Sequence, residues 1–219
     1  MTREEQKLIR ELKNPLGKTC REIGKRWGWK TIAGEQYRER DGMLYMLMVS
    51  IPPVDRGKML KMNISCKPLA LDEVYWDVFH MAEEAKKQPF SFHVNGAFTA
   101  PCLWLPVRKL PLPGPEALES VVEAIFNRTE ELVKENTFSD IAAYRARLEA
   151  DDRRRTLEIV LCLLCEEKYE EAIALIDQGL SAGENGGYLR LGGPKGGILA
   201  DARSWCVARL EEQGCARCT

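Results

Sequence analysis

The sequence predicts an α+β protein: an antiparallel sheet of four or five strands with packed helices, followed by an all-helical C-terminal section. Two patterns indicate this order. Extended apolar runs separated by turn residues fill the segment from residue 35 to residue 66, and from Pro115 onward the apolar spacing is helical. We therefore expect an α+β domain over residues 1–150 and a helical C-terminal subdomain over residues 151–219. A chain of 219 residues with 45% hydrophobic content can bury a core of this size.

The N-terminal segment has the apolar spacing of two helices. The first is expected to stop at Asn14 and Pro15, because proline removes an amide donor and clashes with the preceding turn. The second is expected to end at Gly28 and to bury one face. That face consists of Leu16, Cys20, Ile23 and Trp27.

The sheet is expected to begin with a hairpin. "EQYRERDGMLYMLMVSI", residues 35–51, reads as two strands around Asp41 and Gly42, a pair suited to the positive φ angles of a tight turn. "KMLKMNISC", residues 58–66, predicts a third strand. "FSFHVNGAF" and "PCLWLPV" supply one or two more, after which the prolines up to Pro115 are expected to leave the sheet.

Helices are expected wherever apolar residues recur every three or four positions. The predicted helices are residues 71–87, 116–135, 138–150, 156–166, 168–181 and 198–213. The glycine-rich loop 183–197 is expected to be irregular. It lacks the spacing and the Ser or Thr of a phosphate-binding loop, so we do not expect it to bind a nucleotide.

The composition indicates a soluble cytoplasmic protein. The longest apolar runs are far shorter than the roughly 20 residues of a membrane span, and the first thirty residues contain no signal-peptide core. The eight cysteines are therefore expected to be thiols. Residues 1–112 carry a formal charge of +6 and residues 113–219 carry −7, with the basic excess greatest in residues 1–30.

Two Cys-x-x-Cys pairs raise the question of a zinc site. Cys162 and Cys165 lie inside the apolar run "LEIVLCLLC", where a thiol acts as a small core residue. Cys215 and Cys218, at the chain end, follow a glycine and are the better candidate ligands. Zinc needs four ligands, however, and the two histidines lie in no ligand motif. We therefore expect no metal and no other cofactor.

Two polar surfaces are further candidates. On the predicted helix 71–87, one face carries Glu73, Asp77, His80 and Glu84, a set able to bind a metal or transfer protons but also typical of a solvated face. On the second N-terminal helix, the face opposite the apolar one carries Lys18, Arg21, Lys25 and Arg26. These cations could bind nucleic acid phosphates, although Glu22 interrupts them.

The order of elements over residues 5–150 resembles a bacterial domain family of unknown function. The resemblance lies in a helix ending in Gly-Trp, then "YRERDG", a hydrophobic strand, "MLKMNIS", and a later helix containing "FSDIAAYRARLE". The family has no established activity, so the resemblance implies no catalytic residue. Some of its members lie in gene neighbourhoods suggestive of toxin–immunity systems, which implies a binding role.

A second resemblance lies in "EEKYEEAIALIDQGL", residues 166–180. It is similar to the second helix of a tetratricopeptide hairpin, with Tyr169, Ala172 and Leu180 near the expected positions. Solenoid repeats need neighbours to bury their faces, and this chain contains one such copy. We interpret it as a single helical hairpin docked on the rest of the protein.

These observations favour a non-catalytic protein that binds another protein, through an exposed sheet face or through the C-terminal hairpin. An exposed sheet face used in this way should carry a cluster of apolar side chains. The first alternative is a metal protein or enzyme that uses the cysteine tail or the Glu73–His80 face. The second is a nucleic-acid-binding protein that uses the basic helix, and it is the less favoured partner class.

Overall fold

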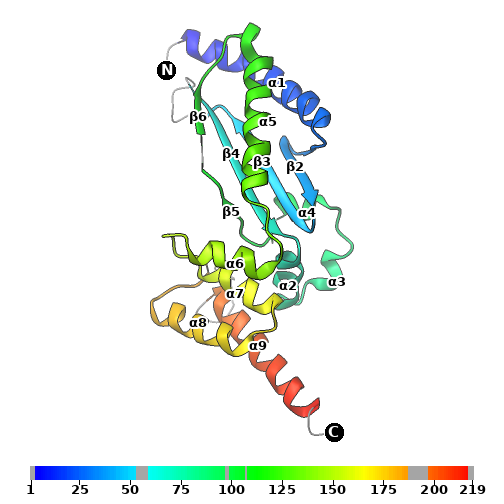
Figure 1. The fold of residues 1–219 in the computed structure, drawn as a ribbon, viewed down its shortest axis with the longest axis vertical. Coiled ribbons are helices and arrows are strands. Elements are labelled where there is room, and N and C mark those ends of the chain that lie inside the picture. The colour runs from blue at the N-terminus through cyan, green and yellow to red at the C-terminus, as the bar shows by residue number, and fades with distance from the viewer. Residues whose placement is uncertain (1–2, 53–58, 97–98, 107, 187–196, 217–219) are drawn as a thin grey trace. The chain divides into compact units, whose positions relative to one another are not determined.

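The chain divides into two compact units in the computed structural model (Figure 1). The structure describes residues 3–52, 59–96, 99–106, 108–186 and 197–216. The first unit contains residues 1–67 and 102–137, and the second contains residues 68–101 and 138–219. An antiparallel sheet in the first unit and helices in the second confirm the α+β class. The boundaries differ from the expected division after residue 150, because the segment after 67 packs with the C-terminal helices.

The sheet of the first unit contains six strands among the described residues, in the order β1-β2-β3-β4-β5, with β6 also paired to β4. The strands are β1 (Lys30–Ile32), β2 (Glu35–Arg40), β3 (Met43–Ser50), β4 (Met59–Pro68), β5 (Leu103–Trp104) and β6 (Arg108–Pro111). Asp41 and Gly42 turn the chain between β2 and β3 with φ of 52° and 73°, so the predicted hairpin is confirmed. A second pair with positive φ, Ala33 and Gly34, joins β1 to β2.

Of the two segments expected to supply one or two more strands, only "PCLWLPV" does so among the described residues, as β5; the expectation that the prolines leave the sheet was wrong. "FSFHVNGAF" contains a short helix, α4 (Ser91–Asn95), and no strand among its described residues. The proline-rich stretch does not leave the sheet, because β6 lies within it and Pro111 pairs opposite Met59. An edge strand accommodates proline, since its outward side needs no amide donor.

Helix α1 (Arg3–Arg26) runs through Pro15, so the predicted break was also wrong. One stripe explains its continuity: Leu12, Leu16, Cys20 and Ile23 are all buried. The helix packs along α5 (Leu118–Glu135), and the two lie on one face of the sheet (Figure 1). Gly24 permits this approach, because a Cβ there would lie 2.7 Å from Gln36 Oε1 and 3.1 Å from the Phe126 ring. Burial of the stripe outweighs the cost of proline.

Among the described residues, the opposite face of the sheet does not present the expected exposed cluster of apolar side chains. Its side chains alternate with those that face α1 and α5, and they include the buried residues Tyr37, Leu44, Met46, Asn63 and Ser65. Among the described residues, the large hydrophobic side chain that stays exposed is that of Trp104, which is 45% accessible to solvent. The sheet face therefore gives no support to a partner-binding role.

The second unit is helical in its described part. Its helices are α2 (Ala70–Val78), α3 (Ala82–Ala85), α4, α6 (Ile141–Glu149), α7 (Thr156–Cys165), α8 (Tyr169–Ser181) and α9 (Gly197–Ala216). Helices α7 and α8 form the predicted hairpin, α9 packs along α8, and α2 packs on α7 (Figure 1). Most of the glycine-rich loop, residues 187–196, lies outside the described residues. Within the described part, no helix is both long enough and apolar enough to cross a membrane.

Candidate functional site

A groove of about 540 Å³ lies between α2, α3, α9 and the connection from α7 to α8. We call it the acidic groove, because four of its lining residues are carboxylates and one is a cation. The lining residues are Glu73, Val74, Asp77, Ala82, Leu164, Cys165, Glu167, Tyr169, Trp205, Arg209, Glu212 and Gln213. All of them belong to the second unit.

The centre of the acidic groove is a contact between α2 and α9. Asp77 Oδ2 accepts hydrogen bonds from Arg209 Nη2 at 2.8 Å and from Trp205 Nε1 at 3.2 Å. The Arg209 guanidinium lies 4.8 Å from the centre of the Trp205 ring, and Tyr169 meets that ring edge-on at 5.8 Å. The hydrogen bond to Asp77, aided by the one to Glu212, raises the pKa of Arg209. These contacts fix an aromatic ring and a guanidinium side by side in the groove.

The rim of the acidic groove is negative and exposed. Glu73 on α2, Glu167 in the α7–α8 connection and Glu212 on α9 are all exposed. Glu212 accepts a hydrogen bond from Arg209 Nη1 at 3.1 Å. Within the described residues, Glu73 and Glu167 form no ion pair.

The first cysteine pair lies where the sequence predicted, in the apolar helix α7. Cys162 is fully buried, and Cys165 lies at the helix end with its Sγ 3.7 Å from the Ala70 carbonyl oxygen. Burial, with a smaller contribution from the Glu73 and Glu166 carboxylates, raises the pKa of Cys165 to about 12. Burial also raises the pKa of Cys162. A thiol with a raised pKa is a poor nucleophile near neutral pH, because the thiolate is the reactive form.

The second cysteine pair is only half described. Cys215 is exposed in the last turn of α9, while Cys218 lies outside the described residues. Across the described ranges, no three His, Cys, Asp or Glu side chains come together as a group able to hold a metal ion.

The prediction of a single helix over residues 71–87 was wrong, so Glu73, Asp77, His80 and Glu84 do not share one helix face. Helix α2 ends at Val78, and His80 has a φ of 55°, which turns the chain before α3 begins at Ala82. Only Glu73 and Asp77 of the predicted set line the acidic groove. His80 and Glu84 are exposed and are not among its lining residues.

The four cations predicted on the second N-terminal helix are exposed along α1, but two of them have carboxylate partners. Arg26 Nη2 lies 2.7 Å from Glu123 and 3.4 Å from Glu119, both on α5. Lys18 lies 3.8 Å from Glu22. Arg21 and Lys25 lie on the same exposed part of the helix. Trp27, which could have stacked a base, donates its indole N–H to Glu123 at 3.4 Å.

The sequence analysis missed a pair formed by Asp72 and His93. Asp72 is completely buried, and its two oxygens lie 2.8 Å from His93 Nδ1 and 2.7 Å from the Ala100 amide nitrogen. The His93 ring also lies 4.7 Å from that of Trp76. Such a pair can orient an imidazole for proton transfer, but His93 lines neither the acidic groove nor the cavity described next. Its evident effect is to hold the segment from α4 to Ala100 against α2.

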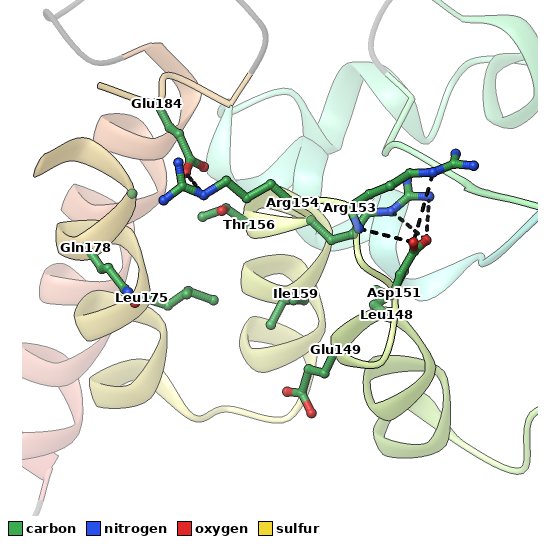
Figure 2. Close-up of a pocket in the computed structure, with 12 residues that line it drawn as sticks. Leu148, Glu149, Asp151, Arg153, Arg154, Thr156, Ile159, Leu175, Gln178 and Glu184 are labelled. Atoms are coloured by element: carbon green, nitrogen blue, oxygen red, sulfur yellow. Dashed lines mark hydrogen bonds and ion pairs between the residues drawn. The ribbon is translucent and has the colours of Figure 1, made fainter. Parts of the chain in front are cut away.

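A cavity of about 230 Å³ lies between the α6–α7 connection and α8, beside three consecutive arginines (Figure 2). Arg155 is nearly buried and donates to Asp151 at 3.1 Å and to Glu158 at 3.0 Å. Arg154 Nε lies 2.8 Å from Glu184, and the Arg153 amide donates to Asp151. The hydrogen bonds that Asp151 accepts lower its pKa, and the bond from the Arg153 amide contributes most. The arginines thus tie neighbouring segments together, and their charge is matched by local carboxylates.

The residues that build the acidic groove carried little signal in the sequence. Asp77 contacts Trp205 and Arg209 across 128 and 132 positions, so no local pattern joins them. The available signal was the pair Trp205 and Arg209 at i and i+4 on a long helix, a spacing that places both side chains on one face. Comparisons of the chain with protein-family models, with characterised proteins and with solved structures give no match.

Proposed function

We propose that this protein is a non-catalytic protein-binding module and that the acidic groove is its binding site. The observation that carries the proposal is the partly exposed cluster of Trp205, Arg209 and Asp77. Tryptophan and arginine are the residue types that most often dominate binding energies at protein interfaces. Here both are held in place before any partner arrives, which reduces the entropy lost on binding.

The chemistry of the acidic groove favours binding over catalysis. Its cysteine is a thiol of high pKa, and no histidine is among its lining residues. Its central carboxylate, Asp77, already accepts two hydrogen bonds from Arg209 and Trp205. Such an arrangement offers shape and charge to a partner but no activated nucleophile.

The two sequence resemblances support the same class of function. Residues 5–150 resemble a bacterial domain family in which some members lie near toxin–immunity genes. Residues 166–180 resemble part of a tetratricopeptide hairpin, and they supply Glu167 and Tyr169 to the acidic groove. A bacterial protein with an immunity-type role would use such a groove to hold another protein.

A displayed library of random 12-residue peptides, selected on the full-length protein, tests the proposal. We expect enriched peptides that bind the wild type and Trp104→Ala alike, with binding lost in Trp205→Ala. Trp104 is the matched control, since it is an exposed tryptophan of the first unit. Truncating a central interface tryptophan should weaken binding by at least roughly thirtyfold, equivalent to about 2 kcal/mol.

A second variant guards against misfolding of Trp205→Ala. Ala82→Gln adds bulk to the acidic groove without removing an internal contact, and it should weaken the same peptides. Circular dichroism would show whether each variant is folded. Peptides that bind folded Trp205→Ala and Ala82→Gln as tightly as the wild type would exclude the groove, and a selection that enriches no peptide would contradict the proposal.

A further inference from the structure

We propose that the acidic groove receives a basic segment of a partner protein, one that presents Lys or Arg side chains next to apolar ones. This inference rests on the proposed function and assigns the chemistry of the ligand. The charge of the groove leads to it. Of the five charged residues that line the groove, four are carboxylates, and the fifth, Arg209, is bonded to Asp77 and Glu212.

The uncompensated charge lies on the rim. Glu73 on α2 and Glu167 in the α7–α8 connection are both exposed, and neither forms an ion pair within the described residues. The unit as a whole has the same sign, because it carries 13 Lys and Arg against 19 Asp and Glu. A negative rim on a negative unit attracts cationic segments and repels acidic ones.

The interior of the groove already holds a guanidinium, that of Arg209. It is stacked at 4.8 Å from the Trp205 ring and hydrogen-bonded to Asp77 at 2.8 Å. Arg209 therefore already uses Asp77, so the carboxylates left for an incoming Lys or Arg are Glu73 and Glu167 on the rim. Val74 supplies partly exposed apolar surface in the groove, on which the aliphatic stem of a Lys or Arg can pack.

Three displayed libraries of 12-residue peptides test the assignment on the full-length protein. One contains Lys and Arg but no Asp or Glu, one contains Asp and Glu but no Lys or Arg, and one contains none of the four. We expect binders from the basic library only, with affinities that fall as the salt concentration rises from about 50 mM to about 500 mM.

Matched charge reversals test whether the basic peptides bind at the carboxylates of the acidic groove. The double variant Glu73→Lys/Glu167→Lys should bind the selected basic peptides at least roughly tenfold more weakly, because two attractions become repulsions. Glu170→Lys/Glu171→Lys reverses two exposed charges on the neighbouring helix that do not line the groove, and it should leave the affinity within about twofold.

The outcomes separate the inference from the proposed function. Binders that come from the neutral or acidic library and are lost in Trp205→Ala would overturn the basic ligand and keep the groove as a binding site. Basic binders that ignore the Glu73 and Glu167 reversals would also overturn it. Self-association lost in Trp205→Ala would assign the groove to a second copy of the chain, and no binders from any library would remove the proposed function itself.

Discussion

Each of the two units contains a tryptophan, an arginine and a carboxylate in the same arrangement, but the two clusters differ in their exposure to solvent. In the first unit, Arg38 lies 4.9 Å from the Trp29 ring, and Glu130 accepts from both residues at 2.9 Å. In the second unit, Arg209 lies 4.8 Å from the Trp205 ring, and Asp77 accepts from both. The Arg38 and Glu130 side chains are 17% and 15% exposed, whereas those of Arg209 and Asp77 are 40% and 41% exposed.

This difference in exposure separates a structural contact from a candidate binding site. The first cluster joins β2 to α5 through mostly buried side chains. The second joins α2 to α9 but keeps an aromatic ring and charged groups in contact with solvent. The chemistry of the side chains is therefore not sufficient to assign a role, and their burial decides it.

The largest expected effect concerns Cys165, the cysteine that lines the acidic groove. Burial raises the pKa of Cys165 to about 12 and that of Cys20, in the first unit, also to about 12. At a pH of about 8, both should react with iodoacetamide at least roughly tenfold more slowly than free cysteine, because their smaller thiolate fraction outweighs the higher nucleophilicity of a thiolate of high pKa. Peptide mapping by mass spectrometry of the folded protein measures this, and rapid labelling of Cys165 would make the groove a reactive site.

The same raised thiol pKa values determine how the free energy of unfolding changes with pH. Since folding raises the pKa of these thiols, their contribution to stability is fully present below about pH 8.5 and is lost as the pH rises above it. The free energy of unfolding should therefore fall in alkaline solution.

The next effect compares the two carboxylates directly. Glu130→Ala should lower the free energy of unfolding by about 3 kcal/mol, because it leaves the mostly buried Arg38 guanidinium without its carboxylate and the Trp29 indole N–H without its acceptor. Asp77→Ala breaks the equivalent exposed contact and should lower it by about 1 kcal/mol or less. Urea unfolding followed by circular dichroism measures both. Equal losses would remove the distinction between the structural cluster and the groove cluster.

The sequence predicted the elements of this fold better than it predicted their ends. The Asp41–Gly42 turn was predictable because few residues tolerate two positive φ angles in succession. The continuity of α1 was not, because the penalty of Pro15 is local whereas the burial of Leu12, Leu16, Cys20 and Ile23 depends on contacts with α5 and the sheet. The break at His80 had no glycine or proline to signal it.

The candidate site was less predictable still. Asp77 was identified from its helical face, but its expected partners His80 and Glu84 lie beyond the break, and its actual partners lie on a helix more than 120 positions away. The predicted burial of Cys162 was confirmed because an apolar run by itself indicates burial, whereas Cys165 at the helix end is only partly buried. Contacts between distant helices have no such local sign.

The central claim is that the cluster in the second unit binds a partner and its counterpart in the first unit does not. The most direct measurement is a titration of the labelled protein with a selected basic peptide, following the indole N–H signals of its five tryptophans by nuclear magnetic resonance. The account predicts that the Trp205 signal shifts and that the Trp29 signal does not. A titration in which Trp205 is unchanged while Trp29 or Trp104 shifts would contradict it.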